Sequence, residues 1–333
     1  MRQLTYLRAR STTEAIAAFT RAGADARYIA GGTTLYDLMK LGVERPMHLI
    51  DVSSLEQADR IDTGGDRLFF GAGALMADVA ENAVVRRDYP VLAESLFKAA
   101  SQQLRNMATV GGNLLQRTRC PYFRNGAGGI YPCNKREPGS GCAAIEGIDR
   151  GQAVLGTSSA CTAVSPGDWP VALTALDATI ELIGPSGDRS VPIGDFYLLP
   201  GSTPHREFAI QPGEIITGIA VPKTSAGARS TYHKIRDRES YAFALASAAV
   251  ALTLDQGRIT TAHVALGGVG TRPWRARETE ALLQGQPPTR EAALGAARAA
   301  FANARPGKLN AFKIELGART IADAVVIAAE RNA

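Results

Sequence analysis

The chain has 333 residues, a formal net charge of +5 and 45% hydrophobic residues. A length beyond roughly 250–300 residues favours two or three domains over a single one. The ordinary apolar content excludes a disordered or a fibrous protein. No apolar run approaches the ~20 residues that a membrane helix needs, so we expect no membrane insertion.

The excess of basic residues does not indicate nucleic-acid binding. Lysines and arginines are scattered among acidic residues, and only 6% of the residues are aromatic, so no basic stripe with stacking side chains is evident. The sequence from Met1 to Tyr6 has no apolar signal core, and we therefore expect no export signal on this chain.

Residues 1–54 are expected to form a small α/β unit. Ser11, Thr12 or Thr13 can cap a helix whose first turn contains Glu14. The unit continues with a short strand at 27–30, a glycine turn, a helical face at Leu35, Leu38 and Met39, and a second strand at 47–52.

A second unit is expected over residues 55–223, with an insertion at 116–165. Its elements are a strand at 67–73, helices at 74–81 and 91–104, a helix at 169–176 that Asp168 caps, and strands at 179–183 and 215–221.

Residues 222–229 are typical of a linker, and a third unit is expected to fill 224–333. Its strands are predicted at 230–237, 241–254 and 258–267, with a hairpin turn at 255–257, and its helices at 274–284, 289–303 and 318–332. The fold class is therefore α+β, with an antiparallel sheet and a helical layer in the last domain.

Two glycine turns are candidates for binding a phosphate. The first is Ala30-Gly-Gly-Thr-Thr34 and the second is Thr109-Val-Gly-Gly-Asn113, and each is expected where a strand ends. Glycine lets backbone N–H groups converge on an anion, and Thr or Asn side chains add donors. Neither turn has the Gly-x-Gly-x-x-Gly pattern of a Rossmann nucleotide site. Each turn alone could also be an ordinary tight turn.

All four cysteines lie in the insertion, at Cys120, Cys133, Cys142 and Cys161. The segment around them is rich in Gly and Pro and has no helical or strand periodicity, which predicts a long ordered loop. The spacing leaves three interpretations open. Disulfides need an oxidising compartment, zinc prefers paired Cys-x2-Cys knuckles that are absent here, and an iron–sulfur cluster tolerates irregular spacing.

The two glycine turns together resemble those of the FAD-binding middle subunits of the molybdenum hydroxylases, the family of xanthine dehydrogenase and aldehyde oxidoreductase. That family has an Ala-Gly-Gly-Thr loop and an Arg-Asn-x-Ala-Thr-x-Gly-Gly-Asn loop, which stand here at 30–34 and 105–113. Further runs match in the family's order, including Asp195-Phe-Tyr197, Tyr232-His-Lys-Ile-Arg236 and Leu266-Gly-Gly-Val269. The resemblance covers essentially the whole chain.

The resemblance implies a fold of the PCMH/VAO flavoprotein type in two α/β subdomains, followed by a domain like the carboxyl-terminal domain of the CO dehydrogenase flavoprotein. It also implies which residues bind FAD. The first loop and the second loop would cradle the diphosphate, Asp168 would accept hydrogen bonds from a ribose hydroxyl, and Lys234 would lie near the pyrimidine end of the flavin. The implied FAD-binding residues are Ala30, Gly31, Gly32, Thr33, Thr34, Leu35, Thr109, Gly111, Gly112, Asn113, Asp168, Lys234, Tyr241 and Ala242.

Two of these residues have ordinary structural alternatives. Asp168 could be only a helix cap, and Lys234 could be only a solvated strand lysine. Tyr241 and Ala242 align with residues that flank the isoalloxazine ring.

The cysteine insertion is where the sequence departs from most of that family. A subset, the FAD subunits of bacterial periplasmic aldehyde oxidoreductases, shares the runs around Cys120, Cys133, Cys142 and Cys161. In that subset the four cysteines hold a 4Fe–4S cluster, which the resemblance implies here. Hydroxybenzoyl-CoA reductases have a comparable insertion with different surrounding residues.

The resemblance implies an electron-transfer subunit of an oxidoreductase with no catalytic residue for substrate chemistry on this chain. Expected partners are a large molybdenum-cofactor subunit and a small subunit with two 2Fe–2S clusters, in a heterotrimer, together with an external electron acceptor. His48, His205, His233 and His263 are expected to be structural or exposed. Localisation is expected to be periplasmic by co-export with a signal-bearing partner, with the cytoplasm as the alternative.

Three alternatives remain at this stage. The chain could belong to a reductase or to a xanthine-dehydrogenase-like complex, it could be a zinc-binding scaffold with a vestigial flavin site, or it could be a stand-alone flavin oxidase.

Overall fold

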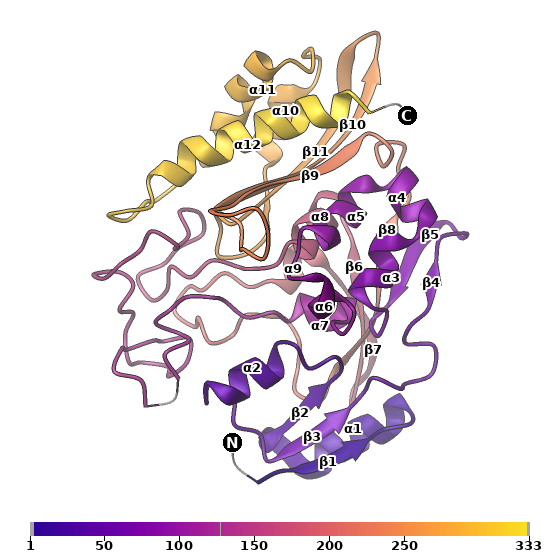
Figure 1. Cartoon of the computed structure of the whole chain (residues 1–333), viewed down its shortest axis with the longest axis vertical. Helices are drawn as coiled ribbons and strands as arrows, with labels where there is room; N and C mark the ends of the chain where they lie inside the picture. The colour runs from indigo at the N-terminus through magenta and orange to yellow at the C-terminus, as the bar shows by residue number, and fades with distance from the viewer. Residues whose placement is uncertain (1–2, 127, 332–333) are drawn as a thin grey trace.

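The computed structural model describes residues 3–126 and 128–331. These residues form three sheets with helices around them, and Figure 1 shows the sheets following one another from the amino-terminal region to the carboxyl-terminal region. The expected α+β class is confirmed.

The amino-terminal subdomain is a three-stranded parallel sheet in the order β1-β3-β2 with a helix on it. Its first helix begins where the sequence predicts, because the Ser11 side chain accepts from the Glu14 N–H and Glu14 accepts in return from the Arg10 N–H. Strand β1 was not predicted from the sequence. The elements are β1 (Thr5–Arg8), α1 (Thr12–Ala22), η1 (Gly23–Asp25), β2 (Ala26–Ile29), α2 (Leu35–Lys40) and β3 (His48–Asp51).

The second subdomain is a five-stranded antiparallel sheet in the order β4-β5-β8-β6-β7, covered by short helices. Trp169 is fully buried and meets Phe70 edge to face at a centroid distance of 5.5 Å, which fastens α8 to the sheet. The elements are β4 (Ile61–Asp62), β5 (Arg67–Gly71), α3 (Met76–Glu81), α4 (Ala83–Asp88), α5 (Pro90–Phe97), α6 (Gln102–Arg105), α7 (Val110–Leu114), α8 (Trp169–Ala175), β6 (Thr179–Gly184), β7 (Gly187–Pro192), α9 (Ile193–Phe196) and β8 (Ile215–Pro222).

The carboxyl-terminal domain is a four-stranded antiparallel sheet in the order β12-β11-β10-β9 under a layer of helices (Figure 1). Its small residues pack tightly, since β10 and α12 contact each other through buried alanines such as Ala248 and Ala322. The elements are β9 (Ser230–Ile235), β10 (Ala246–Asp255), β11 (Arg258–Gly267), β12 (Trp274–Arg275), α10 (Arg277–Leu283), α11 (Arg290–Ala297), η2 (Arg298–Phe301) and α12 (Phe312–Ala329).

Several predicted elements differ from the observed ones. The helix predicted at 91–104 is two helices, because Ala100 has a φ of 49° and Ser101 caps a new helix at Gln102. The strand predicted from 241 begins only at Ala246, because Tyr241 has a φ of 52°. The helix predicted at 274–284 begins at Arg277, after the short strand β12.

The last helix also differs from the prediction of 318–332. It begins at Phe312, because Gly317 lies inside the helix rather than before its first residue. A Cβ at Gly317 would lie 2.2 Å from the Phe301 ring, so the glycine allows close packing there. The prediction for residue 332 lies outside the described residues.

The cysteine insertion is a long loop, as predicted. Between α7 and α8 the described residues contain only isolated β-bridges, among them the bridge between Cys133 and Cys142. The loop is nevertheless anchored on both sides: Arg117 pairs with Glu44 of the first subdomain, and Asp149 accepts from the backbone N–H groups of Lys308 and Leu309 before α12. Figure 1 shows it at the side of the molecule, between the first subdomain and the carboxyl-terminal helices.

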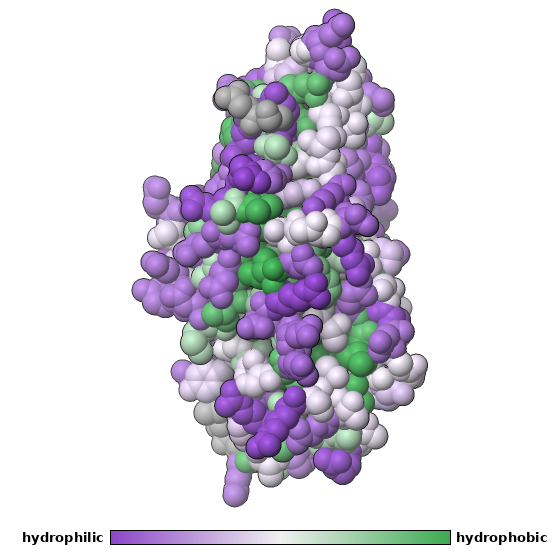
Figure 2. All heavy atoms as spheres, turned by 90° about the vertical axis from the view of Figure 1, so that its right-hand side faces the viewer, coloured by the Kyte–Doolittle hydropathy of each residue, from purple (hydrophilic) through white to green (hydrophobic). Residues whose placement is uncertain are grey.

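Within residues 3–126 and 128–331, no helix has the length and apolarity to cross a bilayer. Figure 2 shows hydrophilic side chains interspersed with small hydrophobic clusters over one face of the molecule.

A flavin cavity beside a four-cysteine loop

The main cavity of the protein has a volume of about 1210 Å³, which is large for a small-molecule site. The two subdomains, the cysteine insertion and the carboxyl-terminal domain all contribute to its wall. Of the FAD-binding residues that the sequence implied, all but Gly111 line this cavity. Gly111 instead packs against Ala72, where a Cβ would lie 2.6 Å from the alanine Cβ.

The first glycine loop connects β2 to α2 and meets the second loop directly. A Cβ at Gly31 would lie 1.8 Å from the Met107 carbonyl oxygen, so only glycine allows this approach of the two backbones. Gly32 has a φ of 71°, a conformation in which glycine is not strained. The two loops therefore form one continuous surface of backbone and small side chains.

The second glycine segment was predicted at the end of a strand, and this expectation is wrong. Thr109 instead precedes the short helix α7, and its Oγ1 accepts a hydrogen bond from the Gly112 N–H at 3.1 Å. Gly111, Gly112 and Asn113 are thus residues of a helix. The helix, in place of the predicted strand end, still presents backbone groups and small side chains, which suit the binding of an anion.

Asp168 and Lys234 form a buried pair in the cavity wall. The Lys234 Nζ lies 2.8 Å from Asp168 Oδ2 and also donates to the Lys98 carbonyl, and its side chain is only 1% exposed. Lys234 is therefore not a solvated lysine. Asp168 precedes α8, but its side chain makes no capping bond, so the predicted cap is wrong.

The Tyr232 hydroxyl completes this pair. It donates to Asp168 Oδ1 at 2.6 Å and lies 2.9 Å from Ser247 Oγ. Burial raises the pKa of Asp168, while the Lys234 ammonium and the Tyr232 hydroxyl oppose that change. The carboxylate thus has two protein partners, and Lys234 has an acidic counter-ion.

Two buried polar atoms on the cavity wall have no partner in the described residues. They are Asn113 Oδ1 and Gln152 Oε1. Buried amide groups are nearly always hydrogen-bonded, so these atoms suit a polar ligand. Together with the glycine loops and the volume of the cavity, they fit a dinucleotide such as FAD.

Tyr241 and Ala242 lie on the cavity wall in the segment that leads into β10. Tyr241 is 56% exposed and is held in its left-handed conformation by Arg238, whose Nε donates to the Tyr241 carbonyl. Phe243 follows on the same wall, with the Arg119 guanidinium 5.0 Å from its ring centroid. Arg119 directly precedes Cys120, so this segment contacts the cysteine loop.

The four cysteines converge around one small cavity next to the flavin cavity. All four are free thiols, which does not support the disulfide interpretation. Among the described residues, no group of three His, Cys, Asp or Glu side chains is close enough to hold a single metal ion.

Cys133 and Cys161 are buried, Cys120 and Cys142 are partly buried, and two of the sulfur atoms accept hydrogen bonds. The Cys161 thiol accepts from the Ala163 N–H, and Cys120 accepts from the Gln152 amide, each at 3.4 Å. Burial raises the pKa of Cys161 to about 11 and also raises the pKa of Cys120. Four buried or partly buried thiols, two of them with N–H donors, fit the ligand set of an iron–sulfur cluster, which stabilises bound thiolates.

Sequence reasoning did not select every residue of the wall. Gln152 and Lys313 line the cavity, yet neither lies in a recognisable motif. Lys313 was placed before the predicted last helix, and no local signal connects it to the glycine loops. None of the four histidines belongs to a metal-ligand group within the described part of the chain.

This cavity and its two facing glycine loops define a flavoprotein of the FAD-binding type. Residues 2–224 match the model of the FAD-binding domain in molybdopterin dehydrogenase, and residues 230–326 match that of the CO dehydrogenase flavoprotein carboxyl-terminal domain. The chain belongs to the family of FAD-binding subunits of molybdopterin dehydrogenases, which are oxidoreductases.

Similar proteins agree with this assignment. The chain is 46% identical to an aldehyde oxidoreductase FAD-binding subunit of Escherichia coli over 97% of each protein. It is 29% identical to a carbon monoxide dehydrogenase medium chain of Afipia carboxidovorans, over 91% of this chain and 88% of the other. A solved carbon monoxide dehydrogenase from Hydrogenophaga pseudoflava is similar with a TM-score of 0.77 and 27% identity, over 100% of this chain and 99% of that one.

Proposed function

We propose that this chain is the electron-transfer subunit of a molybdenum-dependent aldehyde oxidoreductase, with FAD in the main cavity and a 4Fe–4S cluster on Cys120, Cys133, Cys142 and Cys161. A large molybdenum-cofactor subunit and a small subunit with two 2Fe–2S clusters would complete a heterotrimer. The single observation that supports it most is that Cys120 lies in the wall of both cavities. A redox centre on the cysteines would therefore adjoin the flavin.

The residues of this chain would bind and enclose the cofactor rather than act on the substrate. When bound, FAD supplies the ability to accept electrons singly and to pass on one or two. The backbone of Gly31, Gly32 and Gly112 would face the FAD diphosphate. The buried Lys234 and Asp168 would hold a polar edge of the FAD in place. The aldehyde class comes from the 46% identical relative in Escherichia coli.

The composition of the purified protein tests this proposal. We expect a yellow-brown protein with about one FAD and four irons per chain, measured by absorbance and by metal analysis. A colourless protein that contains zinc would favour the scaffold alternative and contradict the proposal. Oxidation of an aldehyde by the isolated chain without partners would instead favour a stand-alone oxidase.

Replacing one proposed ligand tests the cluster directly. Cys142→Ser should remove the iron and loosen the loop, while the FAD content stays near one because Cys142 does not line the flavin cavity. Iron analysis and flavin absorbance of the same sample measure both. Ser159→Ala, at an exposed position of the same loop, is a control and should retain the iron. Unchanged iron in Cys142→Ser would exclude this cysteine as a ligand.

Localisation in the periplasm by co-export is part of the proposal and is supported only by the resemblance. A twin-arginine leader on the small iron–sulfur partner, with activity in the periplasmic fraction, is the expected result. A leaderless partner with activity in the cytoplasmic fraction would exclude it.

A further inference from the structure

Lys313 is a buried lysine in the first turn of α12 that lines the flavin cavity. It is only 1% exposed. Its Nζ donates to the Gly268 carbonyl at 2.7 Å and to the Gly151 carbonyl at 3.4 Å. The ammonium therefore joins the helical layer, the end of β11 and the cysteine insertion at one point of the cavity wall.

Lys313 differs from the other enclosed lysines in having no carboxylate partner. Lys234 pairs with Asp168, Lys135 pairs with Glu207, and Lys98 pairs with Glu94. Among the described residues no carboxylate lies within ion-pair distance of the Lys313 Nζ, and both of its acceptors are neutral carbonyls. A buried cation without a counter-ion is costly unless a bound anion compensates it.

Lys313 and Lys234 belong to the same wall. The strand register places Lys234 of β9 opposite Ser247 of β10, and Ser247 opposite Gly267 of β11. Lys234 and Gly267 are thus two strands, or about 10 Å, apart. Gly268, whose carbonyl accepts from Lys313, packs against Ala244 in the segment that contains Tyr241 and Ala242.

The two cations have different roles on this wall. The charge of Lys234 is balanced by Asp168, so it contributes little net field to the cavity. The glycine loops that suit a diphosphate are provided by the two α/β subdomains, whereas Lys313 comes from the carboxyl-terminal domain. With the diphosphate at the glycine loops, the uncompensated charge would face the part of the cofactor beyond the diphosphate.

We propose that Lys313 is the residue that stabilises the negative charge gained by the flavin ring on reduction. The inference rests on the proposed binding of FAD in this cavity. Reduction by two electrons from the substrate, through the partner subunits, and by one proton from solvent leaves one negative charge near N1 of the ring. The positive charge of the Lys313 ammonium would stabilise that negative charge at close range inside an enclosed site.

The surroundings of Lys313 also give the proposal a pH signature. Burial and the nearby Arg150 lower the pKa of Lys313 to about 8, and Asp237, which pairs with Arg150, opposes this change. Asp149, the other nearby carboxylate, is occupied by the Lys308 and Leu309 N–H groups. Above pH 8, Lys313 is neutral while the flavin ring is oxidised. Reduction of the ring should then cause Lys313 to bind a second proton from solvent.

The test is the two-electron midpoint potential of the flavin in the purified, flavin-loaded protein with the partner subunits that it retains. We compare wild type with Lys313→Met and Lys313→Gln, where Gln keeps an amide donor for the Gly268 carbonyl. Both variants should lower the equilibrium constant for reduction roughly tenfold, or about 30 mV for a two-electron couple. Lys223→Met, which removes an exposed lysine outside the cavity, should leave the potential unchanged.

The pH dependence of the flavin midpoint potential distinguishes an effect of the Lys313 charge from a structural effect of the substitution. Above pH 8 the wild-type potential should fall by about 59 mV per pH unit, for two protons per two electrons, and that of the variants by about 30 mV. A wild-type potential and slope in Lys313→Gln would overturn the inference, as would loss of FAD from a folded Lys313→Gln, which would assign the lysine to binding. A wild-type protein without FAD would contradict the proposed function itself.

Discussion

Single glycines determine how closely the two FAD loops can approach each other. Gly31 meets the Met107 backbone, and Gly111 meets Ala72, at distances that a Cβ would not permit. Gly112 has more room, because only the Thr109 Oγ1 lies near, at 2.9 Å from an added Cβ. A side chain at Gly112 would therefore affect the cavity wall more than the packing of the loops.

Gly112→Val should abolish FAD binding with a modest loss of stability. The branched side chain would displace the Thr109 cap and project from a residue that lines the cavity, at a cost of about 1 kcal/mol for the cap. Flavin absorbance of the purified protein and its thermal midpoint measure the two effects. Gly295→Val, in an open position of α11, is the matched control and should retain flavin. A flavin-loaded Gly112→Val would show that the second loop does not contact FAD.

Local signals in the sequence predicted those elements and site residues whose neighbours are close in the chain. The Ser11 cap, the β10–β11 hairpin and the cysteine loop depend on adjacent residues, and the structure confirms them. The break at Ala100 has a local signal, the Ser101 cap, which periodicity does not detect. The early start of α12 depends on the packing of Gly317 against Phe301, so periodicity did not find it. The Asp168–Lys234 pair was missed for the same reason, since it joins residues 66 positions apart.

The sheet of the second subdomain contains an ion pair that predicts a pH-dependent stability. Arg189 of β7 pairs with Glu214, which precedes β8, at 2.6 Å, and Glu214 also accepts from the Gln211 N–H. The Arg189 guanidinium lowers the pKa of Glu214 below its ordinary value of 4.5. The pair therefore stabilises the fold above pH 4.5 and loses this effect as the pH falls through the lowered value.

Glu214→Gln should lower the thermal midpoint at pH 7 by a few °C, corresponding to about 1–2 kcal/mol for hydrogen bonds to a charged group. The difference from wild type should shrink below pH 4.5, because the wild-type carboxyl becomes protonated there. Circular dichroism melts from pH 3 to pH 7 measure it. Glu56→Gln, at an exposed position, should change the midpoint by less than about 0.5 kcal/mol at any pH. If the thermal midpoints of Glu214→Gln and wild type differed by the same amount from pH 3 to pH 7, the effect would not come from the ionised Glu214 carboxylate.

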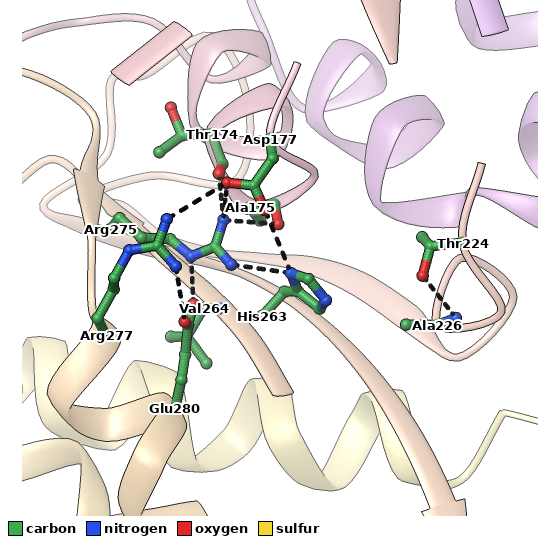
Figure 3. Close-up of polar contacts among 10 residues, drawn as sticks. All are labelled: Thr174, Ala175, Asp177, Thr224, Ala226, His263, Val264, Arg275, Arg277 and Glu280. Carbon is green, nitrogen blue, oxygen red and sulfur yellow. Dashed lines mark hydrogen bonds and ion pairs between the residues drawn. The ribbon is translucent and has the colours of Figure 1, made fainter. Parts of the chain in front are cut away.

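At the scale of the whole molecule, the flavin cavity depends on how the FAD-binding subdomains and the carboxyl-terminal domain are held together. Figure 3 shows one cluster at this junction. Arg275 of β12 donates to the Thr174 and Ala175 carbonyls at the end of α8, to Asp177 Oδ1 at 2.9 Å, and to Glu280 of its own domain. The Arg275 guanidinium thus caps α8 of the second subdomain while it pairs with Glu280 of the carboxyl-terminal domain.

Arg275→Ala should separate the domains more easily and release FAD at a lower temperature. The change would remove the guanidinium from Glu280, which keeps the Val264 N–H as a donor, and from the two helix-end carbonyls. Breaking such a largely buried ion pair costs about 3–5 kcal/mol. Release is measured by the rise of flavin fluorescence on heating. Arg277→Ala is the matched control, because Arg277 reaches the same Asp177 and Glu280 only at 3.6 and 3.8 Å from a 69% exposed position. Its loss should cost less than about 1 kcal/mol. Equal shifts for the two variants would mean that surface charge at this junction, and not the Arg275 cap, holds the cavity closed.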